Sequence, residues 1–156
     1  MKFLEQFKNI QMKNVNLVRL PNISFTKDEK GVLAEKAETN EQFLQQLVNE
    51  GWKKFRDKIP EHKKKIYLDR IKEEFDIVKD LGFIDYFLLV WRVINKARQL
   101  GAFIDWGRGS AAGSLIFYLI GVTGVDPIDK NLFFTRFISK IRAKKEIIDG
   151  ITYIQG

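Results

Sequence analysis

The 156-residue chain contains no cysteine, three prolines and a single histidine. Without cysteine it has no disulfide framework, which is compatible with a reducing compartment. It also has no run of about 18 uncharged apolar residues, and residues 1–6 lack the apolar stretch of a signal peptide. We therefore expect a cytoplasmic protein with no membrane partner. The one histidine, His62, precedes a lysine run with no second ligand beside it, so we expect it at the surface and not on a metal.

Hydrophobic residues make up 45% of the chain and charged residues 30%, and there are thirteen phenylalanines and three tryptophans. This balance excludes an intrinsically disordered chain and is typical of one soluble globular domain. The 27 lysines and arginines outnumber the 20 acidic residues, which gives a net charge of +7. Such an excess favours polyanionic partners: nucleic acids, nucleotide phosphates or acidic proteins.

Three amphipathic helices are predicted in the first two thirds of the chain. The first begins at a capping box over Thr39–Gln42 and ends near Phe55. The second and third are expected over 61–80 and 84–100, and a glycine follows closely after each. Together they predict an α+β fold, predominantly α-helical, with a single folded unit over 39–156.

The rest of the chain is less periodic. Residues 1–38 are expected to be an irregular segment with one strand near 15–19. Further elements are expected in this order: a strand over 102–106, a glycine-rich turn, a helix from there to about residue 120, a short helix over 132–138 and a strand over 147–154.

Two sets of side chains have a plain structural interpretation. Tyr86, Phe87 and Trp91 recur at helical spacing and are predicted to lie in the core, not to form a base-stacking platform. Asp126 precedes a proline and is more typical of a turn residue than of a metal ligand, although Asp129 nearby leaves the second interpretation open.

The glycine-rich turn is the main candidate for chemistry. A strand that leads through Gly107, Arg108, Gly109 and Ser110 into a helix places free backbone N–H groups where an anion can bind. Ser114 would then lie on the same helical face as Ser110. The spacing matches neither a Walker A loop nor the dinucleotide fingerprint. A purely structural turn, with Ser110 as the N-cap, is equally compatible with it.

The residues of this turn carry a resemblance to a known family. Residues 107–115, Gly-Arg-Gly-Ser-Ala-Ala-Gly-Ser-Leu, resemble the signature of the bacterial replicative DNA polymerase III alpha subunit, a C-family DNA polymerase. The similarity extends over roughly residues 39–142. The further matching segments are residues 44–52, 81–91, 126–128, 131–134 and 136–138, together with Arg142.

The resemblance implies a partial polymerase-beta-like nucleotidyltransferase palm with preceding helices. In such a palm the turn binds the incoming deoxynucleoside triphosphate (dNTP), so the implied nucleotide-binding residues are Gly107, Arg108, Gly109, Ser110 and Ser114. An Asp-x-Asp pair and a third aspartate hold two Mg²⁺ ions for attack by the primer 3′ hydroxyl. The implied activity is that of a DNA-directed DNA polymerase acting on primer-template DNA.

The chain departs from this pattern at the metal site. It has no Asp-x-Asp: Asp149 lies in about the right region, but Ile151 occupies the partner position. We therefore predict no catalytic residue and no metal ligand in this chain, and expect Mg²⁺ only in the complete enzyme, with a second polypeptide supplying the aspartates. Trp106 also replaces a proline of the family pattern, and Thr135 replaces a glutamate.

Basic residues form two groups. The group over residues 53–65 is interpreted as a solvated face. The second group follows the turn in a region that forms part of the palm in the relatives, so contacts to phosphates or DNA are predicted there. The predicted contacts are Arg136, Arg142, Lys144 and Lys145.

Three hypotheses follow. The leading one is a piece of a replicative polymerase, made as a split, interrupted or truncated product, that binds dNTP and is inactive alone. The alternative is a non-catalytic DNA- or replisome-binding module derived from such a polymerase. The third is a decayed fragment that folds poorly. Nucleotide binding, DNA binding and cooperative melting distinguish them.

Overall fold

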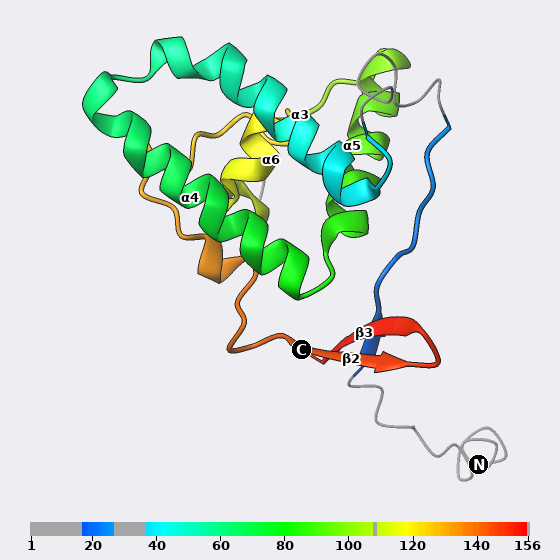
Figure 1. The fold of residues 1–156 in the computed structure, drawn as a ribbon. Helices are drawn as coiled ribbons and strands as arrows, with labels where there is room; N and C mark the ends of the chain where they lie inside the picture. The colour runs from blue at the N-terminus through cyan, green and yellow to red at the C-terminus, as the bar shows by residue number, and fades with distance from the viewer. Residues whose placement is uncertain (1–16, 27–36, 108, 156) are drawn as a thin grey trace, which may run out of the picture.

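The computed structural model describes residues 17–26, 37–107 and 109–155, and it joins a group of helices to a small sheet (Figure 1). The fold is α+β and predominantly helical, as predicted. Its elements are β1 (Leu17–Arg19), α3 (Asn40–Phe55), η2 (Arg56–Lys58), α4 (Glu61–Asp80), α5 (Ile84–Gln99), η3 (Ser110–Gly113), α6 (Leu115–Leu119), η4 (Phe134–Arg136), β2 (Lys144–Ile148) and β3 (Ile151–Gln155), where η marks a 3₁₀ helix. Among the described helices, none is both long and apolar enough to cross a bilayer.

The predicted capping box at the start of α3 is confirmed. The Gln42 backbone N–H donates to Thr39 Oγ1 at 3.2 Å, and the Thr39 N–H donates to Gln42 Oε1 at 3.3 Å. These two bonds satisfy donors that no carbonyl of the helix can reach. The helix then buries one face, with Phe43 and Leu44 fully enclosed.

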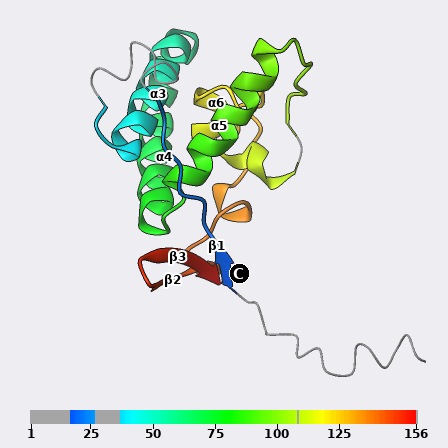
Figure 2. The ribbon, with the colours of Figure 1, turned by 90° about the vertical axis from the view of Figure 1, so that its right-hand side faces the viewer.

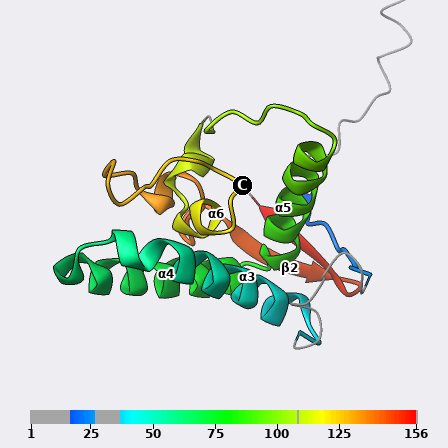
Figure 3. The ribbon, with the colours of Figure 1, turned by 90° about the horizontal axis from the view of Figure 1, so that it is seen from above.

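The short helix α6 lies in the centre of the helical group, covered by α3 and α4 (Figure 3). Four of its five residues are buried. The crossing with α3 depends on Gly51, because a Cβ there would lie 2.2 Å from the carbonyl oxygen of Leu119. Phe117 of α6 stacks on Phe87 of α5, with ring centroids 4.2 Å apart. A helix of five residues therefore obtains its stability from tertiary packing.

The aromatic residues of α5 pack inward, as predicted. Phe87 is fully buried. Trp91 meets Phe43 of α3 edge to face at 5.4 Å between ring centroids, and Tyr86 packs against the same core. These contacts fix α5 against α3.

The sheet has the order β1-β3-β2, and both pairings are antiparallel. The single strand predicted over 147–154 is wrong: β2 and β3 form a hairpin in which Ile148 pairs with Ile151. Asp149 and Gly150 make the connection with φ values of 50° and 75°. Aspartate followed by glycine is a preferred pair for a two-residue turn with positive φ.

Three further predictions of local structure need comment. Residues 17–19 of the strand near 15–19 are confirmed, whereas 15 and 16 lie outside the described residues. Residues 102–106 form no strand, since no sheet neighbour lies beside them in the described chain and Phe103 is 88% exposed. The helix over 132–138 shrinks to η4.

Candidate functional site

The first half of the glycine-rich turn lies open at the surface. Gly107 and Gly109 have φ values of 118° and 74°, in the region that favours glycine. Gly107, Gly109 and Ser110 are all exposed, and a Cβ at Gly109 would meet no atom within 4 Å. Arg108, the predicted charged member, lies outside the described residues. The glycines are therefore needed for the path of the backbone, and Gly109 has free space in front of it.

The second half of the turn is buried. Ser114 has φ −93° and ψ 119°, so the chain is extended there and separates η3 from α6. The predicted continuous helix with Ser110 and Ser114 on one face is thus wrong: Ser110 is exposed, while Ser114 is fully buried. The N-cap role suggested for Ser110 belongs to Ser114, whose hydroxyl accepts from Phe117 N–H at 3.2 Å.

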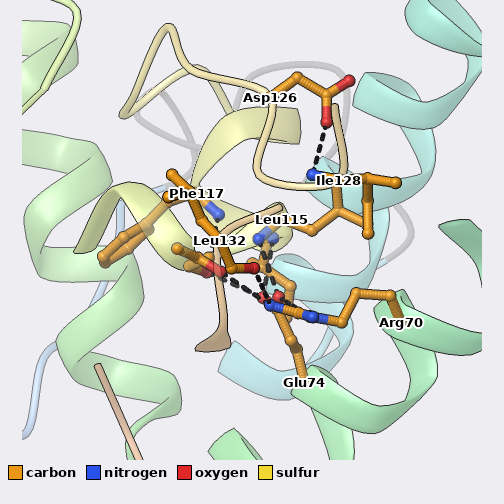
Figure 4. A network of polar contacts seen from close by, with 10 residues as sticks. Arg70, Glu74, Leu115, Phe117, Asp126, Ile128 and Leu132 are labelled. Carbon is orange, nitrogen blue, oxygen red and sulfur yellow. Dashed lines mark hydrogen bonds and ion pairs between the residues drawn. The ribbon is translucent and has the colours of Figure 1, made fainter. Parts of the chain in front are cut away.

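A buried carboxylate from α4 holds this half in place. Glu74 is fully enclosed and accepts four hydrogen bonds (Figure 4). Its Oε2 accepts from the Ser114 hydroxyl at 2.9 Å and from Ile116 N–H at 3.1 Å. Its Oε1 accepts from Leu115 N–H at 2.9 Å and from Arg70 Nε at 2.7 Å. The anion at the start of α6 is therefore the side chain of Glu74, which accepts from the backbone N–H groups of Leu115 and Ile116.

The charge of Glu74 is set by opposing effects. Burial raises the pKa of Glu74 above its ordinary value, and hydrogen bonds from Leu115, Arg70 and Ile116 offset only part of that rise. All four contacts are donors, and one of them comes from the always-charged guanidinium of Arg70. This arrangement fits the ionised carboxylate, because a protonated oxygen would place its own hydrogen against a donor.

We call the ion pair of Glu74 and Arg70 the clamp. Arg70 extends it to the next segment of the chain. Its Nη2 donates to the carbonyl oxygens of Gly113 at 3.0 Å and Leu132 at 3.2 Å. The end of η3 thereby lies against the segment that leads into η4. Gly113 is required at this contact, since a Cβ there would lie 2.8 Å from the carbonyl oxygen of Phe133.

Residues 122–124 support the entry to the turn. Gly124 N–H donates to the carbonyl oxygen of Trp106 at 2.7 Å, and the indole covers Gly124 so closely that a Cβ would lie 2.8 Å from it. Trp106 is nevertheless 69% exposed. The Thr123 side chain lies beside Gly107, and its buried hydroxyl has no hydrogen-bond partner in the described part of the chain. A buried hydroxyl without a partner is unusual in folded proteins.

The predicted phosphate contacts lie at two places. Arg136 is exposed in η4, which packs against η3 and so lies near the turn. Arg142 is exposed and its guanidinium donates to the carbonyl oxygen of Thr135. Lys144 and Lys145 are exposed on β2, in the sheet beyond η4 (Figure 2). The turn, Arg136 and the sheet lysines therefore follow one another across the molecule.

The acidic residues do not fit a metal site. Asp126 makes a turn, as predicted: its carboxylate accepts from Ile128 N–H at 2.9 Å, from Asp129 N–H at 3.2 Å and from the Tyr67 hydroxyl at 2.7 Å. Asp149 lies in the β2–β3 turn. No group of three candidate ligands suitable for a metal occurs in the described ranges.

Glu74 and Arg70 are the residues that sequence reasoning missed. Glu74 lies on the buried face of α4 with Tyr67 and Val78, and Arg70 is half-buried at the edge of that face. Their spacing of four residues is also common for exposed ion pairs. Only their position opposite the turn shows their role.

The candidate site is thus an exposed glycine-serine turn supported by the buried ion pair of Arg70 and Glu74. The sequence around this turn identifies the protein family. The chain belongs to the family of the bacterial DNA polymerase III alpha NTPase domain, whose model matches residues 42–149. A DNA polymerase III subunit alpha from Ureaplasma parvum serovar 3 is 42% identical over 108 residues, which is 69% of this chain and 11% of that relative.

Other relatives match a shorter stretch. The DNA polymerase III subunit alpha of Streptococcus pyogenes is 44% identical over 86 residues, 55% of this chain and 8% of the relative. That of Staphylococcus aureus is 44% identical over 84 residues, 54% of this chain and 8% of the relative. The chain therefore spans about a tenth of the length of these curated relatives.

Proposed function

We propose that this chain is the nucleotide-binding part of a DNA-directed DNA polymerase that acts in the cytoplasm. The exposed backbone of Gly107, Gly109 and Ser110, with the side chain of Arg108, binds the triphosphate of an incoming dNTP. Ser114 holds the turn from inside and does not touch the nucleotide. Primer-template DNA is the second substrate.

The single observation that carries this proposal is the difference in burial along the turn. Glu74 and Arg70 fix residues 113–116 from within, whereas Gly107 and Gly109 are exposed and a Cβ at Gly109 would meet no atom within 4 Å. Backbone N–H groups held in this way bind phosphate oxygens without further rearrangement. The unpartnered Thr123 hydroxyl beside Gly107 adds a polar group to the same place.

Charge around the turn fits a triphosphate. Arg136 is exposed on η4, which packs against η3, and Lys144 and Lys145 are exposed on β2. Arginine binds phosphate in a bidentate manner, and lysine attracts it as a point charge. Arg108 and Arg136 would therefore bind the nucleotide, and the sheet lysines the DNA.

The chemistry of phosphoryl transfer is assigned to carboxylates that this sequence does not contain. Magnesium-dependent transfer needs paired acidic ligands; of the described acidic residues, Asp126 is used in a turn, and Glu74 and Asp80 are used in ion pairs. We propose that this chain binds and orients substrates, and that primer extension requires a polypeptide segment carrying an Asp-x-Asp pair.

Titration with dNTP tests the proposal. Trp106 adjoins the turn and is exposed, so its fluorescence should change on binding in a variant in which Trp52 and Trp91 are replaced by phenylalanine. Arg108→Ala should weaken binding by at least tenfold, whereas Lys72→Ala on the exposed face of α4 should not. Binding of DNA without any response to dNTP would instead support the non-catalytic module.

A reconstitution tests the split enzyme. Mixing the chain with a relative's downstream fragment that contains Asp-x-Asp, together with a primed template, should give Mg²⁺-dependent extension that neither chain gives alone. Two chains that fail to associate would contradict this part of the proposal.

A further inference from the structure

A second basic surface lies at the tip of the hairpin formed by α3, η2 and α4, at the end of these helices far from the sheet (Figure 1). Residues 50–65 contain seven lysines and arginines and three acidic residues, a surplus of four positive charges in a chain whose net charge is +7. We call this surface the basic tip. It consists of Lys53, Lys54, Arg56, Lys58, Lys63, Lys64 and Lys65.

The acidic residues of the segment are already used by neighbours. Glu50 pairs with Lys53 at 2.8 Å, Asp57 with Arg56 at 3.6 Å, and Glu61 with Lys64 at 2.6 Å. The remaining cations of the tip have fewer acidic neighbours. Lys63 is close enough to Asp129 to lower the pKa of that carboxyl, after the larger effect of Lys130.

Within the described chain, three lysines of the tip have no acidic partner. Lys54, Lys58 and Lys65 are exposed, and none of them forms an ion pair with any residue that the structure describes. The Lys58 ammonium lies 5.9 Å from the centre of the Phe55 ring. These charges face water from both sides of the hairpin, so the tip attracts anions in more than one direction.

The base of the tip is rigid. The Phe55 ring packs on Tyr118 of α6 at 4.7 Å between centroids, and Trp52 packs on Tyr67 of α4 at 6.1 Å. Lysines spread over the ends of two helices and the turn between them do not converge on a single small anion. The basic tip suits a chain of phosphates, which gains affinity by releasing condensed counterions.

We infer that the basic tip binds the phosphate backbone of a nucleic acid, at a surface separate from the turn over 107–110. In Figure 3 the tip lies at the outer end of α4, whereas η3 lies on the other side of α6. The choice of nucleic acid as the polyanion rests on the proposed function. The charges and their exposure do not depend on it.

The salt dependence of DNA binding tests this inference. The full chain is titrated with a short fluorescent DNA duplex over a series of NaCl concentrations, and fluorescence anisotropy gives the dissociation constant. In the triple variant Lys54→Gln, Lys58→Gln, Lys65→Gln, the slope of log affinity against log salt should fall in magnitude by about 0.9 for each phosphate that the variant no longer neutralises. Affinity at low salt should fall more than tenfold.

A matched control removes the same charge elsewhere. Lys72, Lys96 and Arg98 are exposed and have no ion pair within the described chain, so their triple glutamine variant has the same net charge as the tip variant. It should keep the slope of the unmodified chain. If the slope fell equally in both variants, the change in DNA binding would depend on net charge alone, and the inference would be wrong.

The partner class has its own control. Polyglutamate and vesicles of phosphatidylserine are titrated in the same way, and tip-dependent binding that is tighter for either than for the duplex would overturn the choice of nucleic acid. The two proposals fail separately: dNTP titration should be unchanged in the tip variant. Tip-dependent DNA binding without any dNTP response would remove the proposed role of the turn, and the reverse result would remove that of the tip.

Discussion

The two halves of the glycine-serine turn differ in almost every physical property. In the first half, Gly107, Gly109 and Ser110 are exposed, both glycines lie at positive φ, and Gly109 has open space in front of it. The half over 113–116 is buried and tied to α4 by the ion pair of Arg70 and Glu74.

The small residues of the two halves therefore have different structural roles. Gly113 is small because a carbonyl oxygen lies against it, whereas Gly109 is small although nothing lies against it. Changes in the buried half should therefore reduce the free energy of unfolding, and changes in the exposed half should reduce ligand binding in a protein that still folds.

The largest effect is expected from Glu74→Ala. This change removes the acceptor of the Ser114 hydroxyl, of the Leu115 and Ile116 backbone N–H groups and of Arg70 Nε. Removing one partner of a buried ion pair costs about 3–5 kcal/mol. Urea denaturation should show this loss, whereas Glu73→Ala, on the exposed face of the same helix, should change stability by less than about 0.5 kcal/mol. Equal values for the two variants would contradict the clamp.

The two glycines give the sharpest form of the comparison. Gly113→Ala forces a Cβ against the carbonyl oxygen of Phe133 and should cost about 1–3 kcal/mol. Gly109→Ala meets no atom but keeps a strained φ of 74°, so it should cost about 1 kcal/mol. We expect Gly109→Ala to weaken dNTP binding in folded protein, as measured by fluorescence titration. If Gly113→Ala proves the milder of the two in urea, the burial argument is wrong.

The two serines should separate in the same way with smaller values. Ser114→Ala removes the N-cap of α6 and one donor to Glu74, and should cost about 1–2 kcal/mol. Ser110→Ala should leave the melting curve unchanged and reduce dNTP affinity. A loss of stability at Ser110 matching that at Ser114 would count against the assignment of the two halves.

The smallest effect concerns Tyr67, which supports the loop after α6. Burial, with a hydrogen bond to Asp126, raises the pKa of the Tyr67 hydroxyl above its ordinary value of 10.0. The folded protein therefore holds this proton more tightly than the unfolded chain, and the associated stability is lost as the pH rises above about 10. Tyr67→Phe should lower stability by about 1 kcal/mol at neutral pH and should remove this part of the alkaline loss. Urea denaturation of the unmodified chain and of Tyr67→Phe at several pH values measures this alkaline loss of stability.

Local signals in the sequence predicted the helices well. The hydroxyl and amide of Thr39 and Gln42 set the start of α3, and the apolar spacing placed Phe87 and Trp91 in the core. These features depend on residues a few positions apart. The Asp149–Gly150 pair carried an equally local signal for the hairpin, but the apolar residues on both sides suggested one longer strand.

The clamp was not predictable in this way. Helical spacing places Glu74 within the apolar stripe of α4, but Ser114 lies 40 residues further along the chain, so the sequence does not indicate what this carboxylate binds. Its burial follows from how α4 packs on α6, which only the three-dimensional structure gives. The interruption at Ser114 has the same origin, because the donors of Leu115 and Ile116 turn toward Glu74.

The reach of Arg70 along the chain has a consequence for folding. It contacts Gly113 and Leu132, which are 43 and 62 residues away in the sequence. Contacts of such separation form late and require loop closure over long segments. The turn thus acquires its shape only when α4, η3 and the segment before η4 have come together. The amide protons of Leu115 and Ile116 should then exchange with solvent only through global unfolding, alongside the slowest in the protein.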